Sequence, residues 1–142
     1  MPSDEAELIH ATCIAIDGAG VLLRGPSGAG KSDLALRLID RGAVLVGDDY
    51  VRIFESDGVL WARVPERIAG RIEVRGVGIV AMPYRSDAPV ELIVDLGEEQ
   101  RLPEPEHVII AGVSLPIARL NPFPASAPIK VELLLSQCKE RP

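Results

Sequence analysis

Apolar residues along this chain gather in short runs, and most of the runs have the composition of β-strands. The first run covers residues 9–16 and includes the β-branched residues Ile9, Thr12, Ile14 and Ile16. The pair Asp17-Gly18 follows it and leads to a second run, Val21-Leu22-Leu23. Apolar runs on either side of an Asp-Gly pair predict two antiparallel strands joined by a tight turn.

One segment has a helical pattern instead. Between Lys31 and Arg41 the apolar residues Leu34, Ala35, Leu38 and Ile39 recur three and four positions apart. That spacing places them on one face of an α-helix. Gly42 stands where a left-handed residue usually ends a helix. We predict an amphipathic helix over residues 31–41, and it is the one convincing helix that the pattern offers.

The chain after residue 42 has mostly strand-like patterns. Residues 43–46 form a continuous apolar run of the kind found in buried parallel strands. Further runs lie at residues 50–54, 59–64, 72–74, 78–82 and 90–95, separated by turn residues such as Ser56-Asp57-Gly58. The second half is therefore predicted to consist mainly of strands.

Proline and glutamate mark the predicted connections. Pro83 and Pro89 bracket one loop, and the glutamate- and proline-rich residues 98–106 predict another, exposed loop. The proline-rich connection at residues 121–128 is expected not to be helical. Apolar runs at residues 107–115 and 129–135 lie on either side of it, and the polar residues that follow are expected to fray.

Length and composition indicate one domain with its own core. The chain has 142 residues, of which 47% are hydrophobic, and this is enough to bury a core. We predict a core over residues 8–135, with frayed ends at residues 1–7 and 136–142. No apolar stretch approaches the roughly 18 residues needed to span a bilayer, and the acidic start is unlike a signal peptide. We therefore expect a cytoplasmic protein that does not enter a membrane.

The charge distribution limits the expected partners. The net charge is −6, and an acidic protein lacks the basic face that nucleic-acid binding requires. A run of cations stands out against this background, namely Arg63, Arg67, Arg71, Arg75 and Arg85. These residues suit either a solvated surface with glutamate partners or a surface that binds phosphate or an acidic partner.

One motif has a specific chemical meaning. The phosphate-binding pattern G-x-x-x-x-G-K-[S/T] is matched at every fixed position by Gly25-Pro26-Ser27-Gly28-Ala29-Gly30-Lys31-Ser32. Its glycines let the backbone curl around a polyphosphate, Lys31 can bind the β- and γ-phosphates of ATP, and Ser32 can bind Mg²⁺. A glycine-rich turn without a ligand is the alternative. The predicted strand before the motif and helix after it favour the phosphate-binding loop.

Carboxylates follow the predicted strand at residues 43–46. Asp48 and Asp49 stand at its C-terminal end, the edge at which ligands bind in open α/β sheets. One of them could therefore reach the γ-phosphate, its Mg²⁺ or an attacking hydroxyl. Adjacent side chains on an extended segment point to opposite sides, so we expect at most one of the two to face a nucleotide. A capped turn with solvated carboxylates is the alternative.

Two further residues are weaker candidates on this evidence alone. Asp95 ends the run at residues 90–95 and competes for the role of the Mg²⁺-binding carboxylate. It ranks below Asp48 because Asp is common where strands meet turns. His10 precedes the phosphate-binding loop, at the start of the first hairpin. A lone histidine in such a place is more often a packing or surface residue than a functional one.

Taken together, these residues resemble the catalytic domain of the bacterial HPr kinase/phosphorylase family. The phosphate-binding loop, Arg41-Gly42 and Asp48-Asp49 are followed by Glu73-Val74-Arg75-Gly76-Val77-Gly78-Ile79, which fits the family's second motif, E-[IV]-R-G-x-G-[IL], throughout. The resemblance extends from about His10 to Leu135. It implies an α/β phosphate-binding-loop kinase domain of the HPr kinase and PEP carboxykinase type, rich in strands and with one main helix.

The resemblance also implies an activity. Family members use ATP and Mg²⁺ to phosphorylate a serine of HPr, a protein of the phosphotransferase system, and many also phosphorolyse phosphoserine to pyrophosphate. Residue by residue, the resemblance implies that Lys31 grips the phosphates, Ser32 and Glu73 bind Mg²⁺, Asp48 exchanges the serine proton, and His10 and Arg101 act in the site. It also implies a homo-oligomer, since the family's catalytic domains form hexamers.

The chain departs from the family pattern in places. It shows no N-terminal regulatory domain and ends where relatives continue into C-terminal helices that help to hold HPr, so it resembles the short alphaproteobacterial forms. The family's P-V-x-x-G-R-N motif, tied to phosphorolysis, is matched at best by residues 116–121, without the glycine. We therefore expect kinase activity ahead of phosphorylase activity. A small-molecule kinase and an ATP-sensing module without phosphotransfer are the alternatives.

Overall fold

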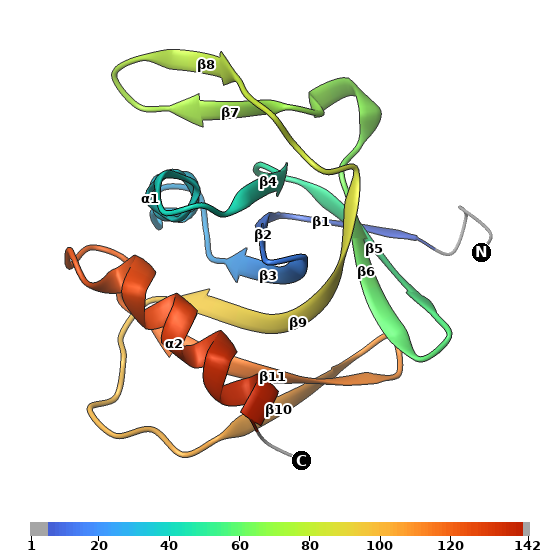
Figure 1. The fold of residues 1–142 in the computed structure, drawn as a ribbon, viewed down its shortest axis with the longest axis vertical. Helices are drawn as coiled ribbons and strands as arrows, with labels where there is room; N and C mark the ends of the chain where they lie inside the picture. Colours follow the sequence, from blue (N-terminus) through green and yellow to red (C-terminus); the bar gives the residue numbers. More distant parts are fainter. Residues whose placement is uncertain (1–5, 141–142) are drawn as a thin grey trace.

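The computed structural model describes residues 6–140, which form a strongly curved sheet with two helices on one face (Figure 1). A short 3-10 turn at Glu66–Ile68 precedes the seventh strand. The elements in chain order are β1 (Glu7–Ile9), β2 (Ala11–Ile16), β3 (Ala19–Arg24), α1 (Lys31–Asp40), β4 (Val44–Gly47), β5 (Val51–Ser56), β6 (Val59–Arg63), β7 (Arg71–Val74), β8 (Gly78–Ala81), β9 (Asp87–Leu96), β10 (Glu106–Ile110), β11 (Val113–Leu120) and α2 (Ala127–Glu140).

Strand β9 joins the two halves of the sheet. β3 lies parallel to it along one side. On its other side, β6 pairs antiparallel with the first part of β9 and β11 pairs parallel with the last part. The sheet continues from β3 through β2 to β4, and from β6 through β5 to β1, while β10 pairs with β11. β7 and β8 form a separate two-stranded sheet that lies beside α1 (Figure 1).

The central strands are buried on both faces. Val21 and Leu23 of β3 pack in the same cluster as Leu34 of α1 and Val131 of α2. Leu22 points the opposite way, into a second cluster that the curled sheet encloses together with Ile93. Helices cover one face of β3 and the curled sheet covers the other. The sequence of this short strand is therefore a nearly continuous run of apolar residues.

The local predictions for the first helix and the hairpins are confirmed. α1 begins at Lys31 and buries Leu34 and Leu38. Gly42, with φ 112°, donates its N–H to the carbonyl oxygen of Ile39 at 3.0 Å and so ends the helix. The predicted turns at Asp17-Gly18 and Asp57-Gly58 join β2 to β3 and β5 to β6.

The expectation of a single helix is wrong, because residues 127–140 form α2. Ala127 and Pro128 belong to its first turn, where proline is tolerated because no N–H is needed. The expected fraying after residue 135 is also wrong as far as Glu140, while residues 1–5 and 141–142 lie outside the described residues. Three consecutive leucines at 133–135 hide the periodicity, and only tertiary packing selects Val131 and Leu135 for burial.

Two strand predictions also need correction. β4 was expected to be a parallel strand, but it pairs antiparallel with β2. The hairpin inserts β2 between β3 and β4, so β4 runs in the same direction as β3 without pairing with it. Pro89 was expected to border a loop, but it lies inside β9 opposite Trp61. Within residues 6–140, neither helix is long and apolar enough to cross a membrane.

Two leucines of α2 test whether this helix belongs to the core. Leu135 is 3% exposed and packs with α1, whereas Leu133 is 58% exposed. Leu135→Ala should lower the free energy of unfolding by about 2–4 kcal/mol because it leaves a cavity. Leu133→Ala is the matched control and should change it by less than about 0.5 kcal/mol. Urea denaturation measures both, and equal effects would contradict the packing of α2.

Candidate active site

The strand register brings distant residues to one edge of the sheet. Ala11 of β2 lies opposite Arg24, where β3 ends, and Cys13 lies opposite Gly47, where β4 ends. The first residues of β2 therefore lie beside the carboxyl ends of β3 and β4. The glycine-rich loop follows β3, and Asp48 and Asp49 follow β4, so the loop and both carboxylates meet at this edge.

The glycine-rich loop, residues 25–30, depends on conformations and close contacts that glycine allows and other residues rarely do. Gly28 and Gly30 take left-handed conformations, with φ 84° and 101°, which other residues rarely adopt. At Gly25 a side chain would lie 2.9 Å from Cβ of Ala29, so glycine is needed there for close approach. Lys31 is 6% exposed, and its Nζ donates to the carbonyl oxygens of Gly25 at 2.7 Å and Pro26 at 3.1 Å.

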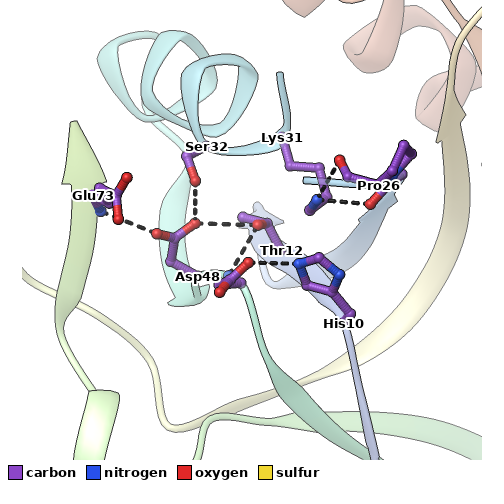
Figure 2. A network of polar contacts seen from close by, with 9 residues as sticks. His10, Thr12, Pro26, Lys31, Ser32, Asp48 and Glu73 are labelled. Carbon is purple, nitrogen blue, oxygen red and sulfur yellow. Dashed lines mark hydrogen bonds and ion pairs between the residues drawn. The ribbon is translucent and has the colours of Figure 1, made fainter. Parts of the chain in front are cut away.

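The carboxylate of Asp48 connects four elements, as Figure 2 shows. Its Oδ1 accepts hydrogen bonds from Ser32 Oγ at 2.6 Å and Thr12 Oγ1 at 3.1 Å. Its Oδ2 accepts one from the backbone N–H of Glu73 at 3.0 Å. Asp48 is only 7% exposed, and a buried carboxylate is tolerated where such donors surround it. It thereby holds β4, α1, β2 and β7 together.

Asp49 faces the same cavity, which the sequence analysis did not expect. Its φ of 71° breaks the extended conformation, so Asp48 and Asp49 do not point to opposite sides. His10 Nε2 lies 2.7 Å from Asp49 Oδ1, and the His10 ring stacks on Tyr50 with centroids 5.1 Å apart. Thr12 accepts a hydrogen bond from the N–H of Asp49 at 3.1 Å, which fixes this turn.

A cavity of about 450 Å³ opens between the loop, α1 and β7. Its lining includes most of the predicted site residues and adds Leu36, Arg75 and Phe123. Glu73 reaches it because the bond from its N–H to Asp48 holds β7 against the site. The set of residues that line the cavity is Ser27, Gly28, Gly30, Lys31, Ser32, Asp33, Leu36, Asp48, Asp49, Glu73, Val74, Arg75 and Phe123.

The oxygen donors of this cavity suit a cation held jointly with phosphates. In the described chain no group of three or more His, Cys, Asp or Glu side chains is placed to hold a metal ion alone. Mg²⁺ needs fewer, since it commonly binds one or two carboxylates together with substrate phosphates and water. The Ser32 hydroxyl and the Glu73 carboxylate fit that pattern.

Several candidates lie elsewhere. Arg101, in the exposed loop after β9, does not line the cavity, and of the five arginines in the described segment 63–85 only Arg75 does. Asp95 accepts hydrogen bonds from Arg24 at 2.7 and 3.0 Å, and this pairing raises the pKa of Arg24. Asp95 is therefore engaged in an ion pair outside the cavity. Burial raises the pKa of the Cys13 thiol to about 12, so Cys13 is no nucleophile.

Sequence reasoning missed Thr12 and Phe123. Thr12 is completely buried and bonds both aspartate residues, yet in the sequence it only adds β-branched character to a strand. Phe123 lies in a proline-rich segment that was interpreted as a connection. A Ser or Thr within an otherwise apolar strand beside a phosphate-binding loop is the one signal that pointed to Thr12.

Comparison with known proteins gives consistent relatives. A family model described as "HPr Serine kinase C-terminal domain" matches residues 4–111. HPr kinase/phosphorylase of Clostridium botulinum is 47% identical over 72 residues, which are 51% of this chain and 24% of the relative. That of a Geobacillus species is 41% identical over 96 residues, 62% of this chain and 31% of the relative. The chain thus spans about a quarter to a third of these curated relatives.

A solved structure extends the likeness to almost the whole chain. The HPr(Ser) kinase/phosphatase from Coxiella burnetii has a TM-score of 0.82 and 27% identity to this chain. The match covers 94% of this chain and 96% of the Coxiella chain. Because the family model matches well over half of the residues and the fold agrees, the chain belongs to the family of the HPr serine kinase C-terminal domain.

Proposed function

We propose that this domain transfers the γ-phosphoryl group of ATP to a serine hydroxyl of HPr, with Mg²⁺ as cofactor. The observation that carries the proposal is the 2.6 Å hydrogen bond between Ser32 and Asp48 in the cavity that Lys31 also lines. A cation for the phosphates, a hydroxyl for the metal and a carboxylate for the acceptor alcohol thereby meet at one sheet edge. The names of the relatives, HPr kinase/phosphorylase, support the same reaction.

Binding comes first in this proposal. The amides of the glycine-rich loop and the ammonium of Lys31 hold the β- and γ-phosphates, after Nζ exchanges the carbonyl oxygens of Gly25 and Pro26 for phosphate oxygens. Ser32 and Glu73 hold Mg²⁺. When bound, the ion neutralises charge that builds up on the phosphates during transfer.

Proton transfer is assigned to Asp48. A carboxylate offers about four acceptor positions; the bonds from Ser32, Thr12 and Glu73 leave one position on Oδ2. The serine oxygen attacks the γ-phosphorus while Asp48 accepts its proton. The bond from the γ-phosphorus to the bridging oxygen breaks, and ADP leaves with the electron pair. His10, held by Asp49 and Tyr50, is not among the residues that line the cavity and is proposed to act through Asp49, which is.

The kinase direction is proposed ahead of phosphorolysis. Within residues 116–121, the nearest match to the family's phosphorolysis motif, residues 116–119 line a separate small cavity of about 70 Å³ that Leu134 of α2 also lines. They do not line the cavity of the glycine-rich loop in the described structure.

The proposal also includes a cytoplasmic location, where ATP and HPr occur together. It further includes a homo-oligomeric state.

The deciding experiment is a transfer assay with γ-labelled ATP, Mg²⁺ and purified HPr. Label on an HPr serine supports the proposal, and HPr with that serine changed to alanine is the control. Label on a metabolite from an extract would instead indicate a small-molecule kinase. Nucleotide binding with no transfer to either acceptor would indicate a sensing module and would end the kinase proposal.

Paired substitutions test the role of Asp48. Asp48→Asn should lower the transfer rate by about a hundredfold or more, because the amide cannot accept the proton, while ATP affinity stays within about threefold of the unsubstituted protein. Asp49→Asn keeps an oxygen for His10 and should cost much less. Single-turnover transfer to HPr and calorimetric ATP binding measure both effects. A larger loss for Asp49→Asn would move the proton acceptor to Asp49.

Thr12 tests whether Asp48 must be held in place. Thr12→Val removes a donor to Asp48 and leaves the N–H of Asp49 without its acceptor. The free energy of unfolding should fall by about 1–3 kcal/mol, and the transfer rate should fall with KM for ATP nearly unchanged. Thr12→Ser keeps the hydroxyl and should restore most of the rate. If the two variants transfer phosphate equally well, these hydrogen bonds do not position Asp48.

A further inference from the structure

The cavity contains an aromatic side chain that the phosphotransfer chemistry does not use. Phe123 lines it together with Gly28, Gly30 and Leu36, yet 71% of Phe123 is exposed. A Cβ on Gly30 would lie 3.6 Å from Cε1 of the Phe123 ring, so the ring lies directly beside the glycine-rich loop. A single exposed apolar side chain is common on protein surfaces, so it is the position of this ring in the lining of the cavity, and not its exposure, that makes it a candidate ligand contact.

The segment that carries Phe123 is firmly fixed from the α1 side. Arg37 of α1 donates to the carbonyl oxygens of Pro122 and, at 3.2 Å, of Pro124, which flank the aromatic residue. Arg37 also pairs with Asp33 at 3.0 Å. The two prolines limit the backbone further, because their rings fix φ. The ring is therefore presented by a rigid support.

A second set of contacts fixes the segment from the α2 side. Asn121 Oδ1 accepts a hydrogen bond from the N–H of Phe123 at 3.1 Å. The N–H of Asn121 donates to Glu99 at 3.0 Å, and Lys130 of α2 lies 2.8 Å from the same carboxylate. These bonds hold the pKa of Glu99 below its usual range, the Lys130 bond contributing most. Rigid aromatic platforms bind flat ligands at low entropic cost.

The position of Phe123 separates it from the acceptor side. Asp48 and Asp49 line the cavity from the end of β4 and Glu73 from β7, whereas Phe123 lines it from the connection that leads into α2 and Asp33 from the first turn of α1. In Figure 1, α1 lies between the β7–β8 sheet and α2, and both contact it. A nucleotide with its terminal phosphate at Asp48 would direct its other end away from β4 and β7, along the first turns of α1, where Asp33, Leu36 and Phe123 line the cavity.

We infer that Phe123 is the stacking platform for the base of the nucleotide whose phosphates the glycine-rich loop binds. The inference rests on the proposed function and adds a base-binding residue to it. Leu36 forms the apolar border of this base site. Stacking of a base on an aromatic ring adds affinity without reading hydrogen-bonding groups, since every base has a π-face. Phe123 would therefore contribute to affinity for the nucleotide but not for its phosphates alone.

Calorimetry with two ligands tests the inference, using ATP and inorganic tripolyphosphate, each with Mg²⁺. Phe123→Ala should weaken ATP binding roughly five- to hundredfold and leave tripolyphosphate binding unchanged. Phe123→Trp should retain ATP affinity because the aromatic face remains. Leu102→Ala is the matched control, since Leu102 is an apolar residue that is 82% exposed outside the cavity; this variant should bind both ligands normally.

Three results would overturn the inference. Equal loss of ATP and tripolyphosphate by Phe123→Ala would show that the residue only supports the loop. Unchanged ATP affinity with a raised KM for HPr would show that Phe123 contacts the protein substrate instead. Absence of any effect would remove it from the site. Failure of the proposed function is distinguishable, because the unsubstituted protein would then bind ATP through Phe123 but transfer no phosphate to HPr.

Discussion

The buried carboxylate of Asp48 is the interaction on which the site depends. It is nearly excluded from solvent and receives hydrogen bonds from Ser32, Thr12 and the backbone of Glu73. Loss of one of these donors from a buried position is expensive, because the acceptor cannot turn to water instead. The same three bonds that stabilise Asp48 therefore set the positions of α1, β2 and β7 around the cavity. Fold and site cannot be separated at this residue.

The second helix has two roles that follow from its packing. Its apolar residues Val131 and Leu135 close the core beneath α1. At its start, Lys130 binds Glu99, and further along Arg41 donates two hydrogen bonds to Glu132 at 2.9 and 2.8 Å, which hold the pKa of Glu132 below its usual range. The helix thus fixes both the end of α1 and the segment that presents Phe123 beside the glycine-rich loop.

The chain matches one solved structure almost completely but covers only part of the curated relatives. The chain covers almost the full Coxiella chain but only about a quarter to a third of the curated relatives. Residues 72–79, which carry the family's second motif, form most of the β7–β8 hairpin and bring Glu73 and Arg75 to the cavity. Val77 and Ile79 on this hairpin remain 74% and 65% exposed. The motif therefore contributes lining residues to the cavity mainly from β7 and the residue that follows it.

The features that could be predicted from the amino-acid sequence are local ones. The glycine-rich loop, the helix that follows it and the Asp-Gly hairpins could be predicted because each depends on conformations and contacts among residues close together in the chain. The place of Asp48 directly after the apolar run at residues 43–46 made its position at the sheet edge a reasonable prediction as well.

Other features of the site and the fold depend on contacts between residues far apart in the chain. Asp49 faces the cavity because its left-handed backbone breaks the alternation expected of an extended segment. Asp95 does not line the cavity, because the strand register places it opposite Arg24, with which it pairs. Helix α2 was missed because three consecutive leucines hide its periodicity, and burial of Val131 and Leu135 in the core that α1 also lines selects the helical face. Thr12 and Phe123 are positioned by residues far away in the chain. Such long-range contacts produce no periodic pattern in the sequence, so sequence analysis cannot detect them.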